Sequence, residues 1–213
     1  MARGAWLLLF LLLASSALLG RPALAQRCDC PRGMEHLCRC NVLITEKVAQ
    51  QQQAYLDRLL MAEFAEFIET SPVASVRLGK PEEMRLKGED AQGFIDTESR
   101  ESLTGLLIVI SPRLRRDEAL MVLAHELGHA WQFSSRPDVD DIEDFLAEGF
   151  AEWVAFHLVR RAGLTEFSYR IRNNKDRLYG AAFRWFLDLE ERHGVGAVIS
   201  VMLNWVDRDG RRL

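Results

Sequence analysis

The residues best suited to chemistry in this chain lie in the pentapeptide HELGH, residues 125–129. On a helix, side chains four positions apart lie one above the other, so His125 and His129 can bind one metal ion with Glu126 beside them. The surrounding residues 121–131 are almost all apolar, which leaves this helix little solvent-exposed face. Buried polar side chains need partners, and a zinc ion would supply them. The pentapeptide therefore predicts a zinc site, and a hydrolase is the activity that such a site suits.

A third ligand must come from farther along the chain. In one class of zinc site it is a histidine six residues after His129, but Gln132 and Ser135 stand where that class has glycine and histidine. The alternative is a carboxylate from a second helix, which we predict over residues 140–162. Glu148 emerges there from an apolar stripe of the helix. We therefore expect Glu148 to be the third ligand.

Other acids of the predicted second helix have different expected roles. Glu152, one turn after the expected ligand, is placed to accept a hydrogen bond from the outer nitrogen of a ligating histidine, and a surface acid is the alternative interpretation. Glu143 and Asp144 are the rival candidates for the third ligand. Acids at the start of this helix, arginines at its end and Gly163 after it mark the helix ends well.

Three segments, the first of which contains the pentapeptide, resemble those of a known family: LAHELGHAW at residues 123–131, AEGF at 147–150 and LYGAAFR at 178–184. They resemble the gluzincins, and more narrowly the peptidase domain of the "DA-one" proteins. These are LIM-domain-associated, ubiquitin-activated zinc peptidases that limit organ growth in plants and have relatives in bacteria. The likeness covers roughly residues 100–200. The chain has no C-x-x-C pair of a LIM domain and no evident ubiquitin-binding helix, so the likeness does not extend to ubiquitin activation.

The resemblance implies a zincin-like fold and peptidase activity, with zinc held by His125, His129 and Glu148. Three protein ligands leave one position for water, and ligation to zinc lowers the pKa of that water towards about 7. Glu126 would then act as general base and afterwards protonate the leaving amine. The alternative function is a catalytically inactive zincin-fold module that binds or assembles proteins in the cell envelope. Such a module would commonly have lost Glu126 or a metal ligand.

The first 25 residues predict a cleaved signal peptide, because Arg3 precedes a thirteen-residue apolar core and a small-x-small cleavage site ends at Ala25. The core is shorter than the roughly 20 residues of a membrane helix, so we expect no stable membrane span after cleavage. The mature protein would be secreted or periplasmic, with a protein or peptide substrate as its partner. Cleavage removes two arginines and takes the formal charge from −4 to −6, which argues against nucleic-acid binding.

All four cysteines lie within residues 26–41, at Cys28, Cys30, Cys38 and Cys40. In an oxidising compartment they would form two disulfides, most simply as nested 28–40 and 30–38 pairs, although three pairings are open. A four-cysteine zinc site is the competing interpretation, but C-x-C is a poorer chelating spacing than C-x-x-C. After this segment, residues 42–213 have the length of a single domain with a sizeable core.

The elements that must position the site follow from the hydrophobic periodicity, which predicts a mainly helical α+β domain with a small mixed sheet. Besides the two site helices, helices are predicted over residues 46–69 and 173–192, and strands over 73–78, 84–87, 93–95 and 105–110. The strands at 73–78 and 84–87 are expected to form a hairpin. By resemblance, a strand close to the site binds the substrate backbone by strand addition, and residues 105–110 are the candidate. The alternative interpretation of these residues is an ordinary core strand.

The last predicted helix supplies candidates for stabilising an oxyanion. Tyr179 and His193 lie on its buried face, so both polar tips could face the metal before Gly194 ends the helix. Arg184 is a weaker candidate for the same role. The alternative interpretation is an ordinary packing helix whose tyrosine has a hydrogen-bond partner.

Overall fold

In the computed structural model, the described residues are 42–69, 71–72, 74–88, 91–96, 105–135 and 143–204. The predicted signal peptide, residues 1–25, and the segment 26–41 with its four cysteines lie outside this part of the chain. Within it, no helix has both the length and the apolar content needed to cross a membrane.

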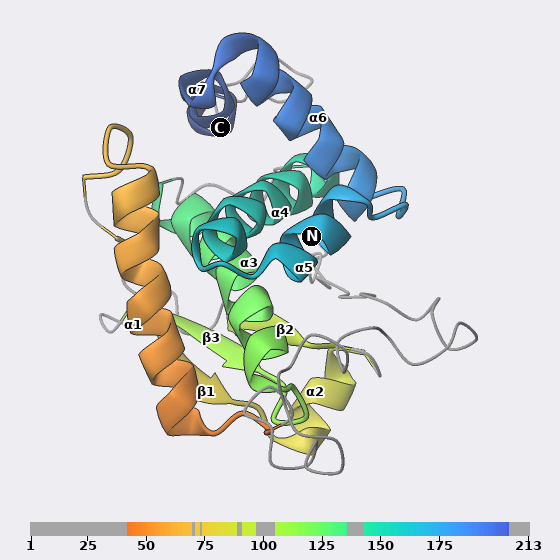
Figure 1. The fold of residues 1–213 in the computed structure, drawn as a ribbon. Coiled ribbons are helices and arrows are strands. Elements are labelled where there is room, and N and C mark those ends of the chain that lie inside the picture. The colour runs from red at the N-terminus through yellow and green to blue at the C-terminus, as the bar shows by residue number, and fades with distance from the viewer. Residues whose placement is uncertain are drawn as a thin grey trace, which may run out of the picture.

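The described residues fold into a mainly helical structure with one small mixed sheet, which confirms the predicted α+β class (Figure 1). In chain order the elements are α1 (Glu46–Glu63), β1 (Ala74–Leu78), α2 (Pro81–Leu86), β2 (Gly93–Asp96), β3 (Leu106–Ile110), α3 (Arg116–Ser135), α4 (Asp144–Arg161), α5 (Thr165–Arg172), α6 (Tyr179–His193) and α7 (Val195–Asn204).

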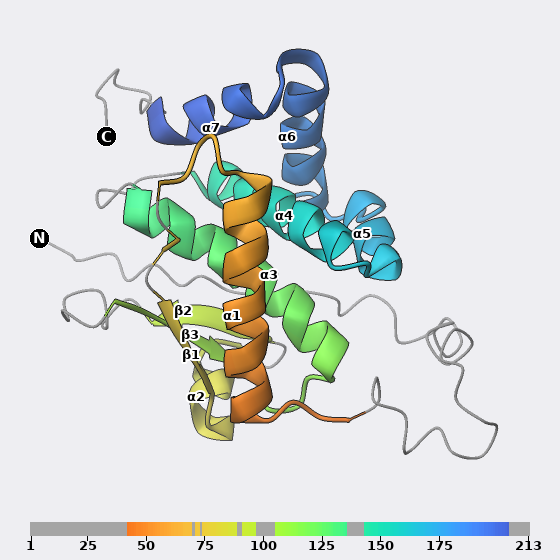
Figure 2. The same cartoon turned by 60° about the vertical axis from the view of Figure 1, so that its left-hand side comes forward.

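The sheet has the strand order β1-β3-β2, with β1 parallel and β2 antiparallel to the central strand. Val76 and Ile95 are the partners of Ile108 on its two sides. Helices α1 and α3 pack against this sheet, and α4 packs on the part of α3 that extends beyond it (Figures 1 and 2). Because β3 is paired along both edges, it has no free edge for a peptide; β2 is an edge strand of the described sheet.

Residues 84–87, which we predicted to pair with residues 73–78 in a hairpin, form the end of helix α2 and its C-cap, Lys87, instead. Pro81 lies in the first turn, where its missing N–H costs nothing, and the Glu83 carboxylate accepts a hydrogen bond from the backbone N–H of Lys80 at 3.2 Å. The hairpin prediction was wrong because Pro81, between two short apolar runs, starts a helix and does not form a turn between strands.

The other predicted helices are present, with changed ends. Helix α1 ends at Glu63, six residues earlier than expected. The helix predicted from residue 173 begins only at Tyr179, because the Asp176 carboxylate accepts hydrogen bonds from the backbone N–H groups of Leu178 (2.8 Å) and Tyr179 (2.9 Å). Helices α5 and α7 were not predicted. Gly163, with a φ of 78°, follows the end of α4 as expected.

Helices α3 and α4 form the centre of the molecule and are buried along most of their length. They approach closely at Gly128, where an added Cβ would lie 2.8 Å from the Cα of Ala151. Behind this contact, the ring of Phe64, the residue that follows α1, packs against Trp131 at 5.4 Å and Trp153 at 5.1 Å between ring centroids. The two helices are thereby held at a fixed separation, with their polar side chains between them.

Candidate metal centre

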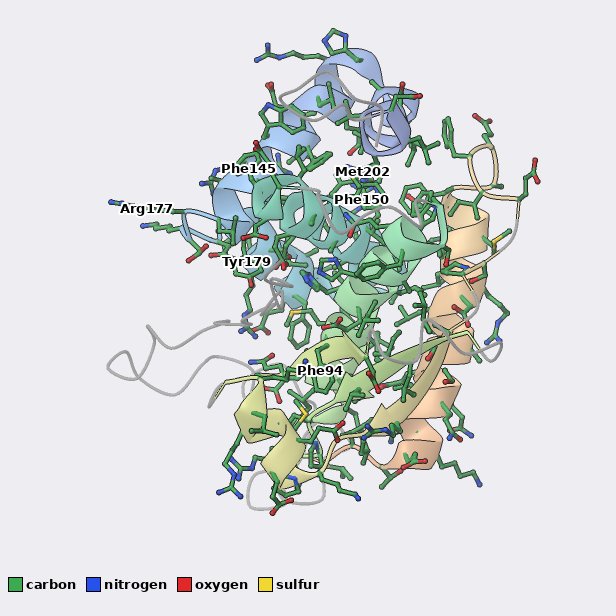
Figure 3. The ribbon with its side chains drawn as sticks, turned by 180° about the vertical axis from the view of Figure 1, so that it is seen from behind. Phe94, Phe145, Phe150, Arg177, Tyr179 and Met202 are labelled. Atoms are coloured by element: carbon green, nitrogen blue, oxygen red, sulfur yellow. The ribbon has the colours of Figure 1, made fainter. Side chains whose placement is uncertain are left out.

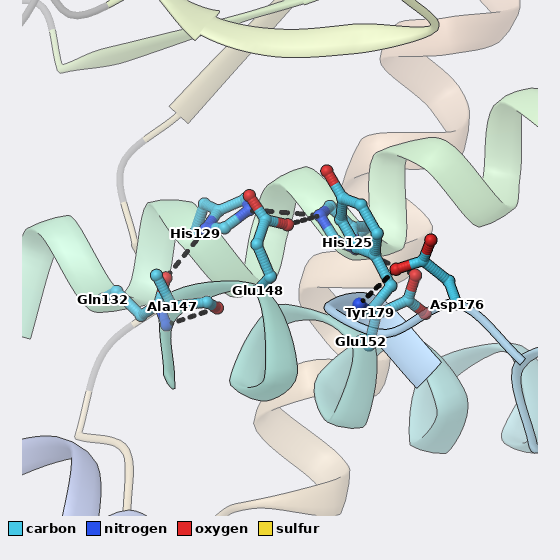
Figure 4. A network of polar contacts seen from close by, with 8 residues as sticks. All are labelled: His125, His129, Gln132, Ala147, Glu148, Glu152, Asp176 and Tyr179. Carbon is cyan, nitrogen blue, oxygen red and sulfur yellow. Dashed lines mark hydrogen bonds and ion pairs between the residues drawn. The ribbon is translucent and has the colours of Figure 1, made fainter. Parts of the chain in front are cut away.

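The two histidines of α3 and one glutamate of α4 meet in the interior. The Nε2 atoms of His125 and His129 are 3.1 Å apart. Glu148 Oε2 lies 3.2 Å from Nε2 of His125 and 3.4 Å from Nε2 of His129 (Figure 4). All three side chains are at most 5% exposed. The expected ligand set is thus brought together from two neighbouring helices.

This arrangement of donors fits a single metal ion. With zinc–ligand bonds of about 2.0–2.1 Å, the ligand atoms of a tetrahedral site are about 3.3 Å apart, close to the three separations in this cluster. Two imidazole nitrogens and one carboxylate oxygen converge on the same point, where an ion could use a lone pair from each. The rival ligands Glu143 and Asp144 are exposed at the start of α4 and do not join the cluster.

The outer nitrogens of both histidines face polar side chains. Nδ1 of His125 lies 3.8 Å from Oε1 of Glu152, which is only 5% exposed, so the surface interpretation of this acid does not hold. Nδ1 of His129 lies 2.8 Å from Oε1 of Gln132. In the sequence, Gln132 indicated only that the third ligand is not a histidine six residues after His129. Its position three residues after His129 was the available signal, since residues three apart on a helix are neighbours.

Glu126 lies beside the ligand cluster and against the sheet. Its side chain is 1% exposed, and neither carboxylate oxygen has a hydrogen-bond partner among the described residues. A Cβ added to Gly93 of β2 would lie 2.8 Å from Oε1 of Glu126, so the absence of a side chain in the strand makes room for this carboxyl group. A cavity with room for about one water molecule is lined by Glu126, His125 and Glu152, among others.

Burial and mutual attraction shift the pKa values in this site. Burial favours the neutral form of Glu148, but the positive charge of His129 and hydrogen bonds from both histidines outweigh it and hold the Glu148 pKa at about 2. Burial would lower the pKa of His129, but attraction to Glu148 raises it to about 9. Burial raises the pKa of Glu126 to about 8, and the charge of Glu148 acts in the same direction while His129 opposes it. Burial thus favours the neutral form of the Glu126 carboxyl group more than that of an ordinary glutamate.

The candidates for oxyanion stabilisation do not all reach the cluster. Tyr179, at the start of α6, is 5% exposed, and its ring centroid lies 6.4 Å from that of His125 (Figures 3 and 4). Burial raises the pKa of its phenol, which keeps the group protonated. His193 is exposed at the other end of α6, about 21 Å along the helix at 1.5 Å per residue. Arg184 is exposed and donates to the backbone carbonyl of Asn174.

No protein-family model matches the chain, and searches of the curated proteins and of the solved structures found no match either.

Proposed function

We propose that this chain is a zinc-dependent metallopeptidase of the gluzincin type, with a zincin-like fold related to the peptidase domain of the DA-one proteins. The observation that carries the proposal is the convergence of His125, His129 and Glu148 beside Glu126, a buried carboxyl group with no hydrogen-bond partner among the described residues. Imidazole nitrogens with a carboxylate oxygen suit zinc, and a site with three protein ligands is typical of catalytic zinc. When bound, zinc lowers the pKa of a water molecule and polarises the scissile carbonyl.

The side chains around the ligands have separate tasks in the proposed reaction. Glu126 accepts the proton of the attacking water and passes it to the leaving amine. Glu152 orients His125 from the side of Nδ1. The Tyr179 phenol, held protonated by burial, donates a hydrogen bond to the oxyanion that forms on the scissile carbonyl. His193 has no part in this scheme, because its end of α6 is exposed and distant from the ligands.

The proposed substrate is an extended segment of a secreted or periplasmic protein or peptide. We assign backbone pairing with this segment to β2 rather than to residues 105–110, which form the central strand β3. Strand β2 lies against Glu126 at Gly93, and among the described strands it pairs only with β3. A peptide added beside β2 would therefore run past the proposed general base.

The test combines zinc content with peptide cleavage, using protein exported through its own N-terminal segment. Wild type is expected to hold about one zinc ion at this site per chain and to cleave an unfolded, fluorescently labelled protein. Glu126→Gln keeps the zinc and loses at least about 100-fold in turnover, because its amide cannot accept the proton. Glu148→Ala loses the zinc. Glu191→Gln is the matched control, since it makes the same change on an exposed side chain of α6 and leaves both readouts unchanged.

The outcomes separate the proposal from its alternative. Cleavage by Glu126→Gln at the wild-type rate would remove Glu126 from the mechanism. A wild-type protein that binds zinc but cleaves no member of a broad peptide library would favour the inactive zincin-fold binding or assembly module. A folded protein that takes up no zinc would overturn the metallopeptidase proposal.

A further inference from the structure

We propose that Gln132 is a positioning residue of the metal site, which fixes the nitrogen that His129 presents and ties the ligands of α3 to the ligand of α4. The inference rests on the proposed zinc site and goes beyond its ligands and proton-transfer groups. The two polar ends of this side chain contact groups on two different helices.

The side-chain amide of Gln132 bridges α3 and α4 in the interior. It is 4% exposed, and its Oε1 lies 2.8 Å from Nδ1 of His129. Its Nε2 donates to the backbone carbonyl of Ala147 at 2.9 Å (Figure 4). Ala147 directly precedes Glu148, so a single amide connects one ligand to the backbone beside another. The sulfur of Met202 from α7 lies 4.0 Å from the same nitrogen, and Met202 lines a small cavity together with Phe150 (Figure 3).

The chemistry of these partners fixes the orientation of the amide. A backbone carbonyl only accepts hydrogen bonds, so the NH₂ end of Gln132 must face Ala147 and the oxygen must face His129. That oxygen is itself an acceptor, so Nδ1 of His129 must carry a proton in either charge state of the ring. Nε2 is then the only ring nitrogen of His129 that can offer a lone pair to a metal ion. It is also the nitrogen that faces His125 and Glu148.

The amide also links the two ligand-bearing helices through its contacts with His129 of α3 and Ala147 of α4. It lies one turn beyond Gly128, where α3 and α4 are in close backbone contact. Without the bridge, the His129 ring can rotate about its side-chain bonds and the start of α4 can shift relative to α3. Partners of this kind typically change metal affinity by about 10–100-fold when they are removed.

The experiment compares two buried glutamines that make similar bonds to backbone carbonyls. Gln132→Met removes the bridge while keeping an unbranched side chain of similar length. Gln53→Met is the matched control, because Gln53 is 5% exposed and donates to the carbonyl of Ala74 at 2.9 Å, away from the ligands. Zinc affinity is measured in the full exported chain by competition with a chromophoric chelator. Gln132→Met should bind zinc about 10–100-fold more weakly, and Gln53→Met should bind it as wild type does.

Nuclear magnetic resonance of wild type with ¹⁵N-labelled histidine provides a second readout that needs no variant. In the zinc-loaded protein, Nδ1 of His129 should carry a proton that exchanges slowly with solvent. An Nδ1 without a proton, or equal zinc affinity for Gln132→Met and wild type, would overturn the positioning role. Failure of wild type to bind zinc would instead overturn the proposed function. Zinc binding without peptide cleavage would leave the role of Gln132 supported and remove only the peptidase activity.

Discussion

The absence of a side chain at Gly93 leaves room for the carboxyl group of Glu126. A methyl group added there is expected to impair the proposed catalysis more than the stability of the fold. A Cβ at this position would lie 2.8 Å from Oε1 of Glu126 and 2.7 Å from Cγ1 of Val122. Oε1 of Glu126 is at the far end of a flexible side chain and can shift, whereas the β-branched Val122 is stiffer and yields only by a small movement of α3, so the strand can persist while Glu126 is displaced. We expect Gly93→Ala to keep its zinc and to lose about 10–100-fold in kcat, because small displacements of a catalytic group have effects of this size.

Steady-state kinetics and zinc analysis check this expectation. Gly196→Ala in α7 serves as the control, because among the described residues its added Cβ would meet only the ring of Phe67, at 3.3 Å. An unchanged kcat in Gly93→Ala would show that the position of Glu126 is not set by β2.

Residue by residue, the sequence predicted the ligand cluster better than its surroundings. His125 and His129 share a helix face by spacing alone, and the apolar stripe around Glu148 indicated that its carboxylate points inward. The role of Gln132 depends on a carbonyl of another helix, which no spacing within α3 reveals. His193 was predicted on the buried face of α6, but it is exposed, because tertiary packing buries only the first half of this helix.

The close contact of α3 and α4 at Gly128 makes the spacing of the ligand-bearing helices sensitive to one methyl group. In Gly128→Ala the new Cβ would lie 2.8 Å from the Cα of Ala151, and a backbone atom cannot move aside alone. We expect the variant to unfold about 1–3 kcal/mol more easily and to bind zinc more weakly, because the helices must separate. Urea unfolding and chelator competition test this. Since alanine otherwise favours a helix by about 1 kcal/mol over glycine, a more stable variant would contradict the contact.

Among the elements, the long helices and the three strands followed from hydrophobic periodicity, whereas the pairing of the sheet and the shorter helices α2, α5 and α7 did not. The parallel pairing of β1 with β3 joins strands that are not consecutive in sequence, and local patterns carry no information about such pairing. The helix α2 had a local signal in Pro81 followed by Glu82 and Glu83, a typical helix start. The short apolar run that follows these residues is more typical of a strand than of a six-residue helix.

A polar network on the far side of α4 links three helices and should make the stability of the whole domain depend on pH. His157 is 3% exposed, and its ring nitrogens lie 3.2 Å from Glu63 of α1 and 3.0 Å from Glu190 of α6. Burial would raise the pKa of Glu190, but hydrogen bonds from His157 and from Trp153 (2.7 Å) outweigh it and lower this pKa below its usual 4.5.

A lowered pKa in the folded state stabilises the fold above the unfolded value, and this contribution is lost as the pH falls through the folded value. We expect Glu190→Gln to be about 1–2 kcal/mol less stable than wild type at neutral pH. This difference should shrink as the pH drops below about 4.5. Urea unfolding across this range measures it, with Glu191→Gln as the exposed control. A difference that stays constant with pH would mean that the ionised form of Glu190 contributes nothing.

Two tryptophans of the aromatic cluster behind α3 and α4 can report on the metal site through their fluorescence. Trp131 follows His129 by two residues and Trp153 directly follows Glu152, and both indoles pack against Phe64 and Phe150. Any change in the separation of α3 and α4 alters the surroundings of both indoles at once. Loading or stripping of the metal should therefore change the intrinsic tryptophan emission, so occupancy can be followed in real time without a label.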